Sequence, residues 1–545
     1  MTAIRITFVG MLAMGVAAAQ PSITSVVNAA SGILPGLPNA GIAQGSIFLI
    51  VGSNLGPGTI SIAATPFQST TLSNTSVSVT VQGQTVSALM YYTSAAQVAA
   101  LLPSATPVGN GTITVTYNGQ PSAQSPITVV ANNLGIFTVT SDGEGAGIVT
   151  YPDYSLVSVL KAPNCGGPST TCGAANPGDT LILWATGLGP VSSDSAVGVA
   201  LPNVPLKLWI GGVQANVLYQ GRGCCVGEDQ INFVVPQNVP LGCAVPLAVQ
   251  IGNEISNYTA IPVSAVGNRT CTPVNAIFTS TVIQELTNPT GPITIGRVKV
   301  QRGPAFENGQ GGQQGNIDSF SGKFMRQSVP FTYQPFIVTY LDTPPAGTCV
   351  VANNLQGNNG PLAELAGLDA GPNFKLTGPN GTQTVSSNNG GVYSATLSST
   401  GSFLSPGNYT LTGSGGADVG PINLAFAIPA PPTLTGAAAA NNVPVTRANG
   451  FTVTWTGGTA GFVQILGSSP IDNTATNGAS FICTAPASAG SLTIPPSVLL
   501  ALPAGSNGNW DFISGALPDV TFTATGLNLG FLTPTYDTPI FTTLQ

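Results

Sequence analysis

The chain has 545 residues, more than one hydrophobic core holds, so about three to four domains are expected. Charged residues make up only 6% and the net charge is -7, which excludes a basic surface for nucleic acid. A hydrophobic content of 43% excludes a disordered chain. The 68 Gly and 45 Pro residues favour many short strands joined by turns.

The amino terminus predicts an export signal. Arg5 precedes an apolar run from Ile6 to Ala19, and the small residues before Gln20 suit a cleavage site. This run is shorter than the roughly 20 apolar residues that cross a bilayer. No later stretch is long and apolar enough either. We therefore expect a mature chain without a transmembrane segment that is secreted, associated with the cell surface or periplasmic.

One unit of the sequence occurs twice. An apolar run between Pro177-Gly178-Asp179 and Gly187-Leu188-Gly189-Pro190 repeats a run between Gln44-Gly45-Ser46 and Asn54-Leu55-Gly56-Pro57. Further landmarks recur at one constant shift, which indicates internal duplication. With a shift of 133 positions, Gln97, Pro103, Pro107, Gly109 and Gly119 correspond to Gln230, Pro236, Pro240, Gly242 and Gly252.

Both copies have the residue pattern of strands. Val77 and Val79 alternate with polar residues, the period of a strand with one buried face. In the second copy Leu206, Leu208 and Ile210 take the inward positions. No window shows a helical stripe, and turn signals recur about every eight to twelve residues. The sequence therefore predicts an all-β chain of tandem immunoglobulin-like β-sandwich domains.

The cysteines suit an oxidising compartment, where disulfides persist. In order, they are Cys165, Cys172, Cys224, Cys225, Cys243, Cys271, Cys349 and Cys483. The first two bracket a short loop and are expected to pair locally. The adjacent Cys224 and Cys225 are expected to reach Cys243 and Cys271 separately, which leaves the last two to pair with each other. A metal site is the competing interpretation, but without His or CxxC spacing we expect no metal and no cofactor.

Several motifs resemble a known family. These are Val27-Asn28-Ala29-Ala30-Ser31, the repeated Gly-rich landmarks, Cys224-Cys225 before Asp229-Gln230-Ile231, and Gly242-Cys243 before Val245-Pro246. They resemble uncharacterised secreted bacterial proteins with a Solibacter-type C-terminal domain, and each unit is similar to the immunoglobulin-like IPT/TIG fold. The resemblance covers about residues 23–264. It implies a fold and export, and it supplies no catalytic residues.

The expected organisation is a signal peptide and four β-rich domains. The signal peptide covers 1–19, the two IPT/TIG-like domains 20–131 and 132–266, a β-rich domain 267–430 and a last immunoglobulin-like domain 431–545. The Gly/Gln-rich stretch from Gly303 to Gly322 is expected to be a loop. Pro429-Ala430-Pro431-Pro432 suits a linker, and Val453 and Trp455 after it alternate with threonines as in a strand.

The chain has no histidine, which excludes imidazole bases, Ser-His or Cys-His pairs and His-ligated zinc. Two carboxylate pairs remain, Asp142 with Glu144 and Glu228 with Asp229. A glycosidase needs two carboxylates held about 5 to 10 Å apart in a cleft, and clustered loop carboxylates also suit calcium. Solvated loop charge is the simpler interpretation of both pairs, so we expect no enzyme.

Two surface features are candidates for contact with a partner. Trp209 should face away from the core that holds Leu208, either stacking on a sugar or lying under a neighbouring domain or the Lys207 stem. The second feature is a basic cluster, whose simpler interpretation is a charged edge strand and whose alternative is a contact with acidic polysaccharide. It contains Arg297, Lys299, Arg302, Lys323 and Arg326.

We therefore expect a structural, adhesive or binding protein outside the cytoplasm, with a cell-surface or extracellular polysaccharide or protein as partner and no nucleic acid. The alternatives are a secreted polysaccharide hydrolase with an unrecognised carboxylate site and a passive spacer. Because no imidazole titrates near neutrality, stability is expected to be nearly flat from about pH 5 to 8.

Overall fold

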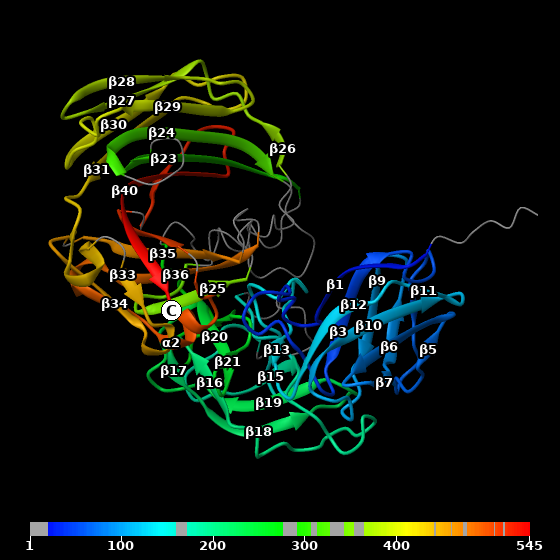
Figure 1. Ribbon diagram of the computed structural model, residues 1–545. Coiled ribbons are helices and arrows are strands. Elements are labelled where there is room, and N and C mark those ends of the chain that lie inside the picture. Colours follow the sequence, from blue (N-terminus) through cyan, green and yellow to red (C-terminus); the bar gives the residue numbers. More distant parts are fainter. Residues whose placement is uncertain are drawn as a thin grey trace, which may run out of the picture.

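The computed structural model describes residues 20–159, 172–275, 291–306, 313–327, 343–353, 364–440, 443–458, 460–471, 477–505, 507–515 and 518–545. The expected signal peptide and Cys165 lie outside these residues. The regular structure of the described residues is mainly strand, and its one α-helix is the short α2 (Pro496–Leu500). Within the described residues, no helix has the length and apolar character that a bilayer span requires. The predicted all-β class of tandem sandwiches is confirmed (Figure 1).

The first unit is a sandwich of two sheets. One sheet has the order β1 (Ser22–Asn28), β3 (Ile47–Ser53), β9 (Gln97–Leu101), β8 (Leu89–Thr93) and β4 (Ser61–Ile62). The other has the order β2 (Ile42–Ala43), β12 (Ser125–Val130), β10 (Gly109–Tyr117), β6 (Thr75–Val81) and β5 (Thr71–Leu72), with β11 (Gln120–Pro121) and β7 (Gln84–Ser87) alongside. The alternating valines of β6 are buried between the two sheets, as their spacing predicts.

The second unit repeats this arrangement. One sheet has the order β13 (Gly135–Ile136), β15 (Thr180–Thr186), β19 (Asp229–Val234) and β18 (Asn216–Arg222), with β14 (Val149–Thr150) beside β15. The other has the order β17 (Val213–Gln214), β16 (Leu206–Ile210), β20 (Gly242–Ile251) and β21 (Glu254–Ile255), with β22 (Thr259–Val263) beside β20. Leu208 and Ile210 are fully buried in this core, as expected.

The strand registers show the duplication directly. Ile47 faces Leu101 in the β3–β9 pair, and Thr180 faces Val234 in the β15–β19 pair, so both partners are shifted by 133 positions. The turn before each pair is held alike, because the Gly45 N–H donates to Leu102 at 2.8 Å and the Gly178 N–H to Val235 at 2.9 Å. The matched landmarks therefore occupy matched places in the two folds.

The last two segments share one large sheet. Its order is β25 (Thr348–Ala352), β36 (Gly478–Pro486), β35 (Phe462–Pro470), β38 (Asn507–Ser514), β40 (Leu529–Leu544), β23 (Ile293–Phe306), β24 (Gln313–Gln327) and β26 (Glu364–Gly367). Additional strands beside it are β29 (Val392–Ser398), β33 (Val443–Val445) and β39 (Val520–Phe522). Figure 1 shows β40 running from the half that holds β23 and β24 to the half that holds β35 and β36.

Two smaller sheets complete two sandwiches on this shared sheet. The sheet β28 (Gly381–Ser386), β27 (Asn373–Gly378), β30 (Gly407–Gly413) and β31 (Ile422–Ile428) packs on the β23–β24 half. The sheet β32 (Thr433–Thr435), β34 (Phe451–Thr456) and β37 (Ser491–Ile494) packs on the β35–β36 half, where Val453 and Trp455 are buried as predicted. The expected border at 430/431 therefore joins two sandwiches that have a sheet in common.

Two expectations for the β23–β24 hairpin are wrong. Most of the Gly/Gln-rich stretch predicted as a loop is strand, because its residues pair in register from Ile293 with Gln327 to Phe306 with Gln313. The basic cluster does not lie on edge strands either, since β23 lies between β40 and β24. β23 is hydrogen-bonded to a strand on each side. These backbone hydrogen bonds stabilise it as a strand, although its polar composition suggests a loop.

Candidate functional site

A groove lies where the carboxyl end of the second unit meets the shared sheet. Its volume is about 420 Å³, within the range of about 300 to 1,000 Å³ that is typical of small-molecule sites. We call it the junction groove. It is lined by Leu241, Val263, Ser264, Ala265, Asn268, Thr270, Thr272, Pro273, Val274, Pro345, Ala346 and Phe462.

One wall of the junction groove is polar, and the residues between its lining side chains are fixed by an ion pair and a disulfide. Asn268, Thr270 and Thr272 line the groove, whereas the intervening Arg269 and Cys271 do not. The Arg269 guanidinium forms an ion pair with Asp179 and donates to the Tyr151 hydroxyl at 3.0 Å, and Cys271 is disulfide-bonded to Cys243. The alternation thus presents hydroxyl and amide groups to the groove on a segment that its neighbours fix.

The groove lining also has an apolar part. Phe462 at the start of β35 contributes an aromatic ring, and Pro345 and Ala346 lie beside it. Leu241 is 50% exposed at this place. Beside the groove, the second unit lies close to Pro345, because a Cβ on Gly242 would lie 2.7 Å from Cγ of that proline. A glycine is required at this contact.

The described residues that line the junction groove are all uncharged. A groove lined by both polar and apolar side chains suits a ligand that has both hydroxyl and C–H groups. Among the described residues that line it there is no carboxylate of the kind that glycoside hydrolysis uses.

A second cavity of about 150 Å³ contains one half of the predicted Asp142–Glu144 pair. Burial raises the pKa of Glu144 to about 7, the Asp142 charge adds to this effect, and the Asn353 N–H opposes it by donating to the Glu144 carboxylate at 3.0 Å. Asp142 instead caps its own turn by accepting from the Glu144 N–H at 3.0 Å. Of the described residues that line this cavity, Glu144 is the one carboxylate and Asp142 is not among them, so the pair is not arranged as a two-carboxylate site.

The Glu228–Asp229 pair is also divided. Asp229 is completely buried, forms an ion pair with Arg222, and accepts from the Leu188 N–H at 2.7 Å. Burial raises the pKa of Asp229 to about 6, opposed by Arg222 and by backbone N–H groups. The Arg222 guanidinium also donates to the carbonyl oxygens of Gly45 and Gly189, both at 2.8 Å. This ion pair therefore ties the first unit to the second.

The expected disulfide pattern is partly wrong. Cys243 is bonded to Cys271, and Cys349 to Cys483, so the prediction for the last two cysteines is confirmed. Cys224 and Cys225 are free and exposed instead of reaching Cys243 and Cys271. Their turn is directed toward the first unit, where Val226 packs on Ile47 and Leu101. Cys172 is disulfide-bonded, and its expected partner Cys165 lies outside the described residues.

Trp209 lies on the outer face of β16, as expected, and is half-buried. Its ring N–H donates to the Gln250 side chain at 3.2 Å, and its cross-strand neighbour is Ala248. Ala248 belongs to the hydrophobic cluster that joins this sheet to the β35–β36 half of the shared sheet. Trp209 does not line the junction groove.

Two residues of the basic cluster are paired with carboxylates. Arg302 forms a two-pronged pair with the buried Asp318, at 2.7 and 3.0 Å. Lys299 lies 4.0 Å from Asp537, whose pKa burial raises to about 6 and Lys299 lowers. Arg297 lies opposite Lys323 across the β23–β24 pair. Two of the three cations proposed for contact, Arg302 and Lys299, are thus used within the sheet.

The residues of the junction groove were missed from the sequence. Phe462 is nearly 200 positions from Thr270 in the chain, and no local pattern links them. The one available signal is the polar alternation Asn268, Thr270 and Thr272 around Arg269 and Cys271, which is typical of an extended segment with one anchored side.

No protein-family model and no curated protein matches the chain. The resemblance to the Solibacter-type family therefore stays a prediction. Partial likenesses to solved structures include SGBP-B from a complex xyloglucan utilization locus in Bacteroides uniformis, with 12% identity, 74% of this chain and 96% of that chain covered, and a TM-score of 0.18. Domains 5–6 of the S-layer protein SbsC match with 12% identity, 45% and 99% coverage, and a TM-score of 0.17. TM-scores this low support no inference about shared fold or function.

Proposed function

We propose that this protein is an extracellular binding protein that holds a segment of neutral polysaccharide in the junction groove and does not cleave it. The observation that carries the proposal is the pairing of a neutral hydroxyl and amide wall with an apolar wall that includes Phe462. Sugar rings present both kinds of surface, and aromatic rings stack on their C–H faces. Hydrogen bonds to Asn268, Thr270 and Thr272 would fix the orientation of the ligand.

Compartment and rigidity support this proposal. The disulfides Cys243–Cys271 and Cys349–Cys483 suit an oxidising space outside the cytoplasm, as does the expected export signal. Cys243–Cys271 also fixes the polar wall before a ligand arrives. A wall that is already ordered loses little conformational entropy on binding, which favours affinity.

The direct test measures binding of neutral and acidic polysaccharides to the mature chain by glycan array and calorimetry. Phe462→Ala should weaken binding about tenfold or more by removing the stacking surface. Thr270→Val with Thr272→Val keeps side-chain shape but removes two hydroxyls, which should cost about 1 to 3 kcal/mol of binding free energy. Tyr154→Ala is the matched control, because Tyr154 is an exposed ring that does not line the groove.

Two further measurements separate this proposal from its alternatives. Binding in a neutral groove should persist at about 1 M salt, where contacts to exposed basic side chains would be screened. Incubation with a bound polysaccharide should release no reducing ends. Unchanged binding by the Phe462 and threonine variants would refute the groove as the site, and released sugar would favour a hydrolase.

A further inference from the structure

The β18–β19 turn, residues 223–228, is fixed at its base. The buried Arg222–Asp229 ion pair closes the two strands just before the turn begins. Within the turn, the Gly223 N–H donates to the Glu228 carbonyl at 2.8 Å, and the Glu228 N–H donates to the Cys225 carbonyl at 3.2 Å. Backbone hydrogen bonds within the turn therefore fix the segment that carries Cys224, Cys225 and Glu228.

The tip of the same turn is clamped by its surroundings. Val226 is buried against the first unit, and its carbonyl accepts from the Tyr91 hydroxyl. The Gly227 carbonyl accepts from the Thr186 hydroxyl at 2.7 Å. Gly227 has φ +74°, and a Cβ there would lie 2.2 Å from Cδ1 of Leu101. Only the side chains at 224, 225 and 228 are left to point outward.

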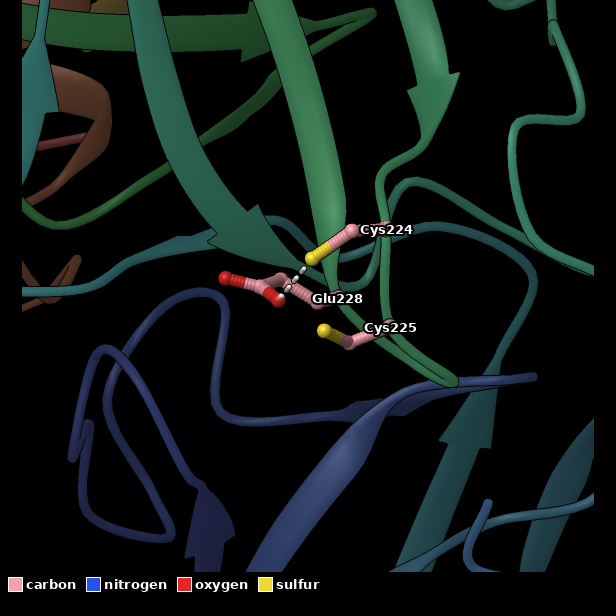
Figure 2. Close-up of side chains that lie close together, drawn as sticks. All are labelled: Cys224, Cys225 and Glu228. Atoms are coloured by element: carbon pink, nitrogen blue, oxygen red, sulfur yellow. Dashed lines mark hydrogen bonds between the residues drawn. The ribbon is translucent and has the colours of Figure 1, made fainter. Parts of the chain in front are cut away.

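Those three side chains converge. The two Cys Sγ atoms and a Glu228 carboxylate oxygen all lie within 4.8 Å of one another. Figure 2 shows the Glu228 carboxylate between the two sulfurs, with Cys224 Sγ 3.7 Å from Oε2. Cys224 and Cys225 are exposed, so an ion can reach them from solvent. Their expected disulfide partners, Cys243 and Cys271, are bonded to each other.

We propose that Cys224, Cys225 and Glu228 form a site for a thiophilic divalent cation of the zinc class. Two sulfurs and a carboxylate oxygen are ligands that zinc takes at about 2.3 and 2.0 to 2.2 Å, so they would lie about 3.5 to 3.8 Å apart in a tetrahedral site. The present separations, 3.7 Å between Cys224 Sγ and Glu228 Oε2 and within 4.8 Å for all three atoms, are close to this geometry. Three protein ligands leave the fourth position open to water or to a group on a partner.

The binding step is balanced. Each cysteine gives its thiol proton to solvent, the two thiolates and the carboxylate bind the dication, and the site keeps one net negative charge. No oxidant or reductant takes part. This site is independent of the junction groove, because none of its residues lines that groove.

The test titrates Cd²⁺ and Zn²⁺ into the full mature chain purified without reductant. We expect one ion per chain, release of protons on binding, and a sulfur-to-cadmium charge-transfer band in the ultraviolet. Cys224→Ser and Cys225→Ser should each weaken binding at least about 100-fold, and Glu228→Gln less. Glu254→Gln, an exposed carboxylate elsewhere in the second unit, should leave binding unchanged.

Thermal unfolding gives the second measurement. Zn²⁺ should raise the Tm of the wild-type chain and leave that of the double variant C224S/C225S unchanged, because only the wild type has a site to couple to folding. The thiol titre of the unfolded, unreduced protein should include both cysteines. An oxidised Cys224–Cys225 pair, or Cd²⁺ binding that survives both serine substitutions, would overturn the proposal.

Discussion

The two copies of the repeated unit have matching strands but different connections. In the first copy, β8 and β9 are joined by residues 94–96, and in the second, β18 and β19 are joined by residues 223–228. The registers of the flanking strands keep the constant shift. The longer connection of the second copy is the one that carries the free cysteines and Glu228 and that contacts the first unit. Duplication preserved the sheets, and the turns diverged.

The copies also satisfy the same backbone group in different ways. The Leu55 N–H donates to the Ala95 carbonyl at 3.0 Å, whereas the corresponding Leu188 N–H donates to the Asp229 carboxylate at 2.7 Å. Residues 20–131 contain no Asp, Glu, Lys or Arg at all. The second copy therefore introduces charge at a place where the first uses only its backbone. Substitutions of the buried charged residues of the second copy should therefore have the largest effect on stability.

The largest effect is expected from Arg222→Met. This change leaves the fully buried Asp229 without its cation and should cost about 3 to 5 kcal/mol of the free energy of unfolding. The control is the double variant R222M/D229N, whose neutral amide can still accept from the Leu188 N–H and should recover much of the loss. Chemical denaturation measures both. A loss below about 1 kcal/mol for R222M would mean that the ion pair does not hold the two copies together.

The next effect is expected from removing the disulfide that only the second copy has. Cys243→Ser with Cys271→Ser opens a loop with a sequence separation of 28 and should cost about 2 to 4 kcal/mol. Polysaccharide binding should weaken at the same time, because the polar wall of the junction groove loses its anchor. The comparison is with Cys349→Ser and Cys483→Ser, which should lower stability without a specific effect on that wall. Equal binding by both double variants would contradict the anchoring role.

A smaller effect concerns pH. The folded chain binds the Glu144 proton more tightly than the unfolded chain, because its pKa is raised to about 7. The free energy of unfolding should therefore rise, by about 1 to 3 kcal/mol, as the pH falls from about 7.5 to 5. Asp537 acts in the same direction, since burial raises its pKa to about 6. Glu144→Gln should reduce the pH dependence of the Tm, measured between about pH 5 and 7.5. A Tm that depends on pH as in the wild type would contradict the contribution of Glu144 to this dependence.

The smallest effect is expected from Trp209→Thr. Trp209 precedes the buried Ile210 at the end of β16 as Thr80 precedes the buried Val81 at the end of β6, so this change gives the second copy the residue of the first. The ring is half-buried and makes one hydrogen bond to Gln250, so about 1 kcal/mol or less of stability should be lost. Binding in the junction groove should be unchanged. A large loss of polysaccharide binding would identify Trp209 as the contact instead.

Local patterns predicted the strands and the duplication well. The alternation around Leu208 and Val453 identified buried faces, because side chains on a strand alternate between its two sides. The long-range features were predicted less well. Cysteine pairing depends on which strands become neighbours, and the proline-rich stretch at 429–432 gave no indication that β40 would pair with β23. The expectation of pH-independent stability was based on the absence of histidine and did not include burial of Glu144.

The sequence by itself determined the all-β class, the repeated unit and its inward-facing residues, since these follow from periods of two and from a constant shift between landmarks. The tertiary structure alone decided that Cys243 pairs with Cys271, that burial raises the pKa of Glu144, Asp229 and Asp537, and that Phe462 lines the same groove as Asn268 and Thr270. The physical reason is the distance in sequence between the residues involved. Strand periodicity depends on neighbouring residues, whereas disulfide pairing, desolvation and grooves depend on distant segments that meet only when the sandwiches pack together.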